Sequence, residues 1–125
     1  MRKKGILIVE REDYYRAHYA ISLKEHDIFF KRSNKDISVL EEFKYDIIVL
    51  KYTSKDAIRG FRYKELVEKI REKNPKVRII IPTSFEKKGG ELLKLGYCDY
   101  TCTKTTLPAT IKGILKNLRK NLIPK

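Results

Sequence analysis

Charged and hydroxyl side chains follow several apolar runs of this 125-residue sequence, at positions where they could share a ligand. Arg11, Lys51, Thr83 and Lys104 each come one or two residues after the end of such a run. If the runs are parallel strands, their carboxyl ends meet at one edge of a sheet, where ligands bind. Three cations and a hydroxyl there would suit an anion such as a phosphate or a small nucleotide. Gly89-Gly90 gives only a weak signal for a phosphate-binding loop.

Lys51 stands at the end of a run that is expected to be buried, so its charge needs either a partner or solvent. The acidic residues Glu10 and Glu12 follow another such run and would lie at the same edge. One hypothesis is an internal salt bridge from Lys51 to Glu10, extended to Glu12. A partly buried pair needs both members, because removing one leaves an uncompensated charge. The alternative is that Lys51 simply extends into solvent from the end of its strand.

Arrangements that would support other chemistry are not evident in the sequence. His18 and His26 are expected to be structural or surface residues, and no Ser/His/Asp or Cys/His set can be assembled. Cys98 and Cys102 are expected on one short strand, about 13 Å apart, which is beyond the roughly 7 Å limit for a disulfide. We therefore expect two reduced thiols, no zinc site and no enzymatic activity.

The elements that would position these residues alternate between strand-length apolar runs and helical patterns. This alternation indicates an α/β protein in which helices cover both faces of a parallel sheet. The expected strands are residues 5–9, 28–31, 46–50, 77–81 and 98–102, and the expected helices are residues 14–25, 37–43, 62–73, 91–95 and 108–122. The fourth helix is expected to be short because Gly89 and Gly90 disfavour an earlier start. Gly96 would end it in a left-handed conformation.

Length and composition indicate a single folded domain over residues 1–125. Hydrophobic residues make up 42% of the chain and charged residues 36%, which is ordinary for a globular protein. No apolar run approaches the roughly 20 residues that a membrane span needs, and the first residues do not resemble a signal peptide. We therefore expect a cytoplasmic protein that does not associate with membranes.

The net charge of +13 bears on the choice of partner. It suits an acidic protein or a nucleic acid, but basic residues spread along the chain also suit a solvated surface. No helix-turn-helix pair, zinc finger or base-stacking platform is evident, so nucleic-acid binding is possible but not favoured. The preferred expectation is a protein partner of unknown identity, which the charge suggests is acidic.

Four segments, at residues 5–15, 45–50, 66–83 and 95–100, resemble the corresponding stretches of response-regulator receiver domains of the CheY-like family. The similarity covers residues 4–122. It implies a flavodoxin-like, doubly wound fold of five βα units with strand order 2-1-3-4-5. It also implies a role in two-component signal transduction.

The resemblance places the phosphorylation pocket of receivers on residues that have lost its chemistry, as in a degenerate pseudo-receiver. Lys51 takes the position of the phosphoacceptor aspartate. Glu10 keeps one acid of the metal-binding pair, and Arg11 replaces the other. At an effective dielectric of 20, each charge about 4 Å from a metal ion contributes on the order of 4 kcal/mol. We therefore expect no Mg²⁺, no other cofactor and no aspartyl phosphorylation.

The resemblance also assigns roles to residues at the ends of the fourth and fifth strands. Thr83 matches the hydroxyl residue that senses the phosphoryl group, and Tyr100 matches the aromatic switch residue. The lysine that usually ends the fifth strand falls on Thr103, with Lys104 one residue later. Thr83 and Tyr100 could keep a mechanical linkage between the pocket and the output face. Without a phosphoryl group to sense, the preferred expectation is that they serve packing.

The output face of receivers consists of the fourth helix, the fifth strand and the fifth helix, and in this chain it is basic. It carries Lys94, Lys112, Lys116 and Arg119, the last three at helical spacing. The expected function is that of an atypical receiver domain, which signals through protein–protein interaction independently of phosphorylation. The alternative is a basic regulatory module that binds an anion or a nucleic acid on the same fold.

Overall fold

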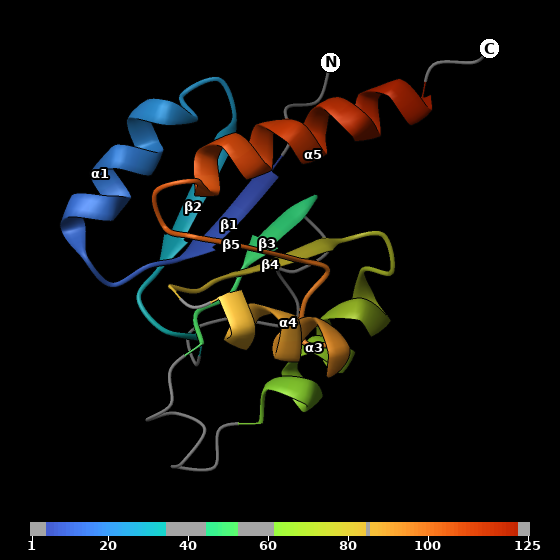
Figure 1. Ribbon diagram of the computed structural model, residues 1–125. Coiled ribbons are helices and arrows are strands. Elements are labelled where there is room, and N and C mark those ends of the chain that lie inside the picture. The colour runs from blue at the N-terminus through green and yellow to red at the C-terminus, as the bar shows by residue number, and fades with distance from the viewer. Residues whose placement is uncertain (1–4, 35–44, 53–61, 85, 123–125) are drawn as a thin grey trace.

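A central parallel sheet organises the chain. The computed structural model describes residues 5–34, 45–52, 62–84 and 86–122, except for the side chains of residues 86 and 118–122. Within these ranges the strands are β1 (Gly5–Val9), β2 (Asp27–Lys31), β3 (Ile47–Val49), β4 (Arg78–Pro82) and β5 (Tyr100–Cys102). All pair in parallel in the order β2-β1-β3-β4-β5 (Figure 1). This topology confirms the predicted flavodoxin-like α/β fold, and each strand begins within two residues of its predicted start.

Helices cover both faces of the sheet. The described helices are α1 (Asp13–Ser22), α3 (Tyr63–Lys73), α4 (Glu86–Lys94) and α5 (Leu107–Leu122). In Figure 1, α1 and α5 lie on one side of the sheet, and α3 and α4 lie on the other. The helix expected at residues 37–43 lies outside the described residues. No helix in the described part of the chain is long and apolar enough to cross a membrane.

Two cores hold these layers together, one on each face of the sheet. All residues of β1 and β3 are buried, because their side chains alternate between the two cores. The first core joins Tyr19 of α1 to Ile111 of α5 across Ile8. The second joins Ile70 of α3 to Leu92 of α4. The carboxyl ends of the strands are thereby fixed at one edge.

The expectation of a short fourth helix was wrong, because α4 already begins at Glu86 and includes both glycines. A Cβ atom added at Gly89 would lie 3.0 Å from Thr101 Oγ1 and 3.3 Å from Thr83 Cγ2. Gly89 therefore lets the helix pack directly against the ends of β4 and β5, where an added Cβ would force its neighbours to shift by a few tenths of an ångström. Gly89 lowers the local helix propensity, but it allows α4 to pack closely against the sheet. Gly96, at φ 77°, ends the turn after α4 in the predicted left-handed conformation.

The start of β5 is fixed by the carboxylate of Asp99. Its Oδ2 atom accepts a hydrogen bond of 2.9 Å from the backbone N–H of Ile79, and its Oδ1 atom lies 2.7 Å from Arg71 Nη2. Cys98 therefore precedes β5, contrary to the prediction that both cysteines lie on this strand. Cys98 and Cys102 are free, as predicted, and burial raises the pKa of Cys98 to about 11.

Candidate functional site at the carboxyl edge of the sheet

An acid that is almost completely buried lies directly after β1. Glu10 is 3% exposed, and its backbone N–H donates a 2.8 Å hydrogen bond to the carbonyl of Lys31, which extends the pairing of β1 with β2. The carboxylate Oε1 atom of Glu10 lies 3.3 Å from Lys104 Nζ, and Oε2 lies 3.4 Å from the same nitrogen. Oε2 also accepts a 3.1 Å hydrogen bond from the backbone N–H of Glu12. Both oxygens of this acid are therefore engaged within the protein.

Two tyrosines of α1 hold Lys104 in this position. The hydroxyl of Tyr19 donates a 2.9 Å hydrogen bond to the carbonyl of Lys104, and the ammonium of Lys104 lies 4.6 Å from the ring centroid of Tyr15. Burial raises the pKa of the Tyr19 hydroxyl, and the charge of Glu10 raises it further. Tyr19 therefore remains protonated and remains a donor. Lys104 therefore connects the loop after β5 to α1 through its carbonyl and to the end of β1 through its ammonium group.

The hypothesis that Lys51 pairs with Glu10 was wrong about the identity of the cation. Among the described residues, Glu10 and Glu12 both pair with Lys104, the latter at 3.8 Å, and Lys51 pairs with neither. The backbone of Lys51 is held instead by the buried side chain of Asn34. Asn34 Nδ2 donates to the Lys51 carbonyl, and the Lys51 N–H donates to Asn34 Oδ1 at 3.0 Å. The two bonds prolong the edge beyond β3 and leave the ammonium group of Lys51 for other contacts.

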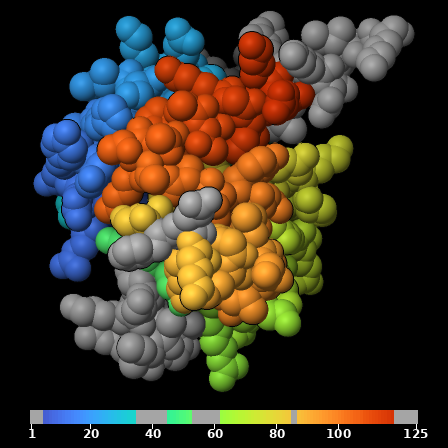
Figure 2. Space-filling view, viewed as in Figure 1, coloured from blue at the N-terminus to red at the C-terminus, as the bar shows by residue number. Residues whose placement is uncertain are grey.

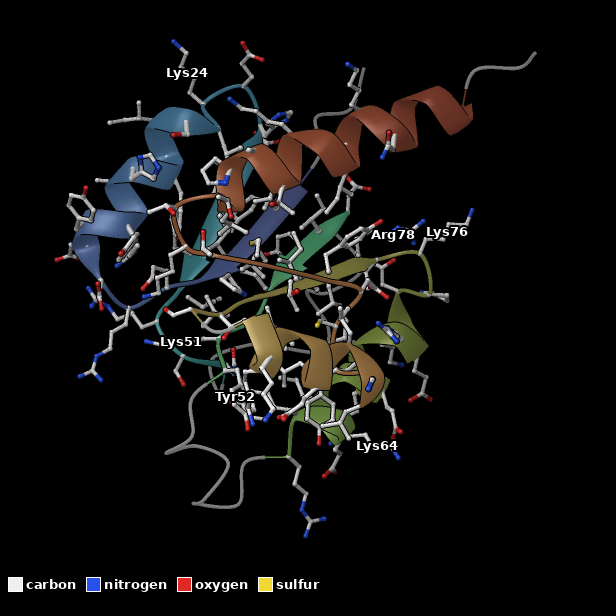
Figure 3. All side chains as sticks on the ribbon, viewed as in Figure 1. Lys24, Lys51, Tyr52, Lys64, Lys76 and Arg78 are labelled. Carbon is white, nitrogen blue, oxygen red and sulfur yellow. The ribbon has the colours of Figure 1, made fainter. Side chains whose placement is uncertain are left out.

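Lys51 faces a cavity of about 620 Å³, which we call the lysine cavity. Its lining residues are Lys51, Tyr52, Pro82, Thr83, Ser84, Lys87, Lys88, Glu91 and Lys104. The structure thus brings together three of the four residues that the sequence suggested for an anion site. Arg11 is exposed and does not line the cavity. Figure 3 shows Lys51 and Tyr52 beside the first turn of α4.

The lining of the lysine cavity is strongly basic, since it contains four lysines and one glutamate. Lys88 Nζ lies 3.5 Å from Glu91 and 4.9 Å from the ring centroid of Tyr52. The hydrogen bond with Tyr52 raises the pKa of the Lys88 ammonium, so this cation stays charged. Tyr52 in turn packs on Tyr63, with ring centroids 4.9 Å apart. Tyr52 therefore forms a wall of the cavity and is backed by a second aromatic ring.

A second cavity, of about 500 Å³, shares Thr83 and Ser84 with the first. We call it the threonine cavity; it is lined by Thr83, Ser84, Thr101, Cys102, Thr103, Thr106 and Thr110. Thr103, at the position where the resemblance places a lysine, hydrogen-bonds Thr106 at the start of α5. Thr83 therefore lies where the two cavities meet, and its methyl carbon Cγ2 is close to Gly89 of α4.

The described acidic side chains at this edge pair with cations of the chain itself. Mg²⁺ binds through carboxylates and water in octahedral geometry. Among the described acidic residues, Glu10 is the buried one, and Lys104 Nζ lies 3.3 Å from its carboxylate. The side chain of Asp13 is 86% exposed and pairs with Arg16 at 3.6 Å. In the part of the chain that the structure describes, no group of three or more acidic, histidine or cysteine residues could hold a metal.

A basic face with exposed apolar residues lies over α4, β5 and α5. Lys94, Lys112 and Lys116 are exposed, whereas the side chain of Arg119 lies outside the described residues. Large apolar side chains accompany them: Leu93 is 42% exposed, Leu95 57% and Tyr100 38%. Figure 2 views this side of the molecule, with α5 above α4. We call Leu93, Lys94, Leu95, Tyr100, Lys112 and Lys116 the α4–α5 face.

Sequence reasoning missed Asn34, Tyr52 and the role of Lys87 and Lys88 in the cavity. The two lysines lie in the first turn of α4, and that turn was not predicted because of Gly89 and Gly90. An earlier helix start would have placed both lysines directly after β4, at the carboxyl edge. The role of Asn34 carries no sequence signal, because its partner is the backbone of Lys51, a residue that follows another strand.

Comparison with known proteins supports the fold. No protein-family model matches the chain, and no curated protein does. Among solved structures, the BeF3-activated DrrB receiver domain is similar at TM-score 0.70 and 16% identity, over 95% of this chain and 99% of that chain. A two-component response regulator from Clostridium difficile is similar at 0.69 and 22% identity, over 93% and 98% of the respective chains.

A third similar structure, described as an adenylate cyclase from Rhodopirellula baltica, has TM-score 0.65 and 14% identity over 97% of this chain and 98% of that one. Each of these identities is too low to carry more than an architecture. The shared architecture agrees with the strand order and with the layers described above. The chain has the fold of response-regulator receiver domains.

Proposed function

We propose that this chain is a receiver-type domain that acts in signal transduction through protein–protein contacts and without phosphorylation. The observation that carries the proposal is the pairing of Lys104 with Glu10, 3.3 Å apart, at the edge where a receiver holds its metal ion. A carboxylate that already has a cationic partner gains little from a metal. Lys51, at the position of the phosphoacceptor, ends in an ammonium group that cannot attack a phosphoryl group while it is protonated.

The experiment for this step is exposure to acetyl phosphate and Mg²⁺, followed by mass measurement of the intact protein. A receiver domain that keeps its aspartate serves as the positive control under the same conditions. We expect no added phosphoryl mass on this chain and no change in its NMR spectrum with BeF3⁻. Stoichiometric, acid-labile phosphorylation of an aspartate would overturn the proposal.

Partner contact is proposed for the α4–α5 face. Three described lysines lie there with three exposed apolar side chains, and interfaces combine apolar area with charge that steers the encounter. An acidic protein fits this surface. Charge reversal at Lys112 and Lys116 should abolish recovery of a specific partner from the native organism.

The matched control for that experiment is reversal at Lys24 and Lys76, which changes the net charge equally. Both are exposed and do not belong to the α4–α5 face: Lys24 lies in the turn after α1, and Lys76 lies in the turn before β4 (Figure 3). If the control pair weakens recovery as much as Lys112→Glu with Lys116→Glu, the contact reflects net charge alone. That result would remove the proposed face.

A further inference from the structure

The lysine cavity has cations that the fold itself leaves without acidic partners. Lys104 is engaged by Glu10, and Lys88 is engaged by Glu91. Among the residues that the structure describes, Lys51 and Lys87 have no acidic side chain within ion-pair distance. Both lysines line the same concave site, which a single anion could occupy.

Hydroxyl groups and an apolar wall complete the site. Thr83 and Ser84 line the cavity at the end of β4, and hydroxyls are ready donors to phosphoryl oxygens. Tyr52 and Pro82 form apolar lining, and the ring of Tyr52 packs on Tyr63 with centroids 4.9 Å apart. Small-molecule sites share this composition, since they combine apolar walls with a few convergent polar groups.

The size of the cavity limits the class of ligand. Its volume of about 620 Å³ falls within the range of roughly 300–1,000 Å³ that small-molecule sites occupy. Inorganic phosphate alone would leave most of this volume unfilled. A ligand that carries both a phosphoryl group and an organic part would use the cations and the apolar wall at once.

We propose that the lysine cavity binds a small phosphomonoester, with its phosphoryl group on Lys51 and Lys87 and its organic part against Tyr52 and Pro82. The binding is reversible and forms no covalent bond. It goes beyond the function proposed above, because it needs neither phosphorylation of the chain nor a protein partner. The two proposals can therefore fail separately.

The test is a titration of the full chain, followed by amide NMR at constant ionic strength. The probes are AMP, ribose 5-phosphate, inorganic phosphate and adenosine. We expect AMP or ribose 5-phosphate to shift the amides around Lys51, Thr83, Ser84 and Lys87. We expect inorganic phosphate to bind at least tenfold more weakly than the better phosphomonoester, and adenosine not to bind in the same range.

Two double variants separate a site from general attraction to a basic protein. Lys51→Ala with Lys87→Ala should weaken binding of the better phosphomonoester about a hundredfold, since each charge-assisted hydrogen bond accounts for about tenfold. Lys24→Ala with Lys76→Ala removes the same charge from exposed positions elsewhere (Figure 3) and should change the affinity less than threefold.

Three results would overturn the proposal. The first is the absence of shifts in the cavity with both phosphomonoesters at millimolar concentration. The second is equal affinity for inorganic phosphate and for the phosphomonoesters, which would indicate an unspecific anion. The third is an equal loss of phosphomonoester affinity in the two double variants. That result would assign the binding to the net charge of the protein, as in non-specific binding of nucleic acids.

Discussion

The ammonium nitrogen of Lys104 lies 3.3 Å from Glu10 Oε1, although the two residues are 94 positions apart in the chain. The Glu10 side chain is 4% exposed and the Lys104 side chain 32%, so the carboxylate depends on this partner more than the ammonium does. The pair joins β1 to the loop after β5, two elements that are not neighbours in the sheet. The ammonium group of Lys104 thereby balances the charge of the buried carboxylate.

Lys104→Ala should lower the free energy of unfolding by about 2 kcal/mol. Removing one member of a buried pair usually costs 3–5 kcal/mol, and the partial exposure of Lys104 reduces that figure. Urea unfolding measures the change, and Lys64→Ala on the exposed side of α3 is the control, with an effect of at most about 0.5 kcal/mol. If both variants unfold alike, Lys104 does not stabilise Glu10. Glu10→Gln should make Lys104→Ala nearly neutral, because no buried charge then remains.

Tyr19→Phe should cost about 1 kcal/mol at neutral pH, because the carbonyl of Lys104 loses its donor. The pKa of Tyr19 is raised above its ordinary value of 10.0, mainly by burial, so folding favours the protonated hydroxyl. The resulting stability is complete below pH 10.0 and is lost as the pH rises above that value toward the folded-state pKa. Unfolding experiments between pH 8 and 11 should therefore show a steeper loss for the natural chain than for Tyr19→Phe. Parallel curves would contradict the assignment.

Asn34→Asp should release the segment around Lys51 while keeping the size of the side chain. Aspartate can still accept the N–H of Lys51 but cannot donate to its carbonyl, and two oxygens would then face each other. We expect a loss of about 2 kcal/mol, since a buried group is left unpaired. Hydrogen exchange gives the local readout: the amide of Lys51 should exchange faster in the variant, whereas that of Ile80 in β4 should change only with global stability.

Gly89→Ala and Gly90→Ala should differ by about 1 kcal/mol or more, although both replace glycine in the same helix. At Gly90 nothing lies within 4 Å of an added Cβ, so the variant gains up to about 1 kcal/mol of helix propensity. At Gly89 the added Cβ meets Thr101 Oγ1 at 3.0 Å, and overpacking offsets that gain. Thermal unfolding measures both variants. Adding Thr101→Ala should recover stability in Gly89→Ala only, and equal stability of the two single variants would contradict the close packing.

The sequence predicted the sheet well because the buried strands carry their own signal. Runs such as Ile6–Leu7–Ile8 and Ile79–Ile80–Ile81 are apolar on both faces, which is typical of parallel strands under two layers of helices. The edge residues Lys51, Thr83 and Lys104 could be placed together for the same reason. Helix α4 was predicted too short, since glycine propensity is local and the contact that requires Gly89 is not.

The pairing of charges could not be predicted from the sequence in the same way. The salt-bridge hypothesis named Lys51 as the partner of Glu10 and considered Lys104 only as part of an anion site, whereas Lys104 is the observed partner. The loop after β5 crosses toward α1, where Tyr15 and Tyr19 hold Lys104. That choice depends on side-chain reach and on ring contacts, which only the assembled fold defines.

The separation of 85 residues between Tyr19 and Lys104 has a consequence for kinetics. A contact that closes so long a loop costs chain entropy and forms late, after the intervening strands have assembled. Interactions that are absent from the folding transition state act on the rate of unfolding and hardly on the rate of folding. This cross-link between α1 and the loop after β5 should therefore lengthen the lifetime of the native state.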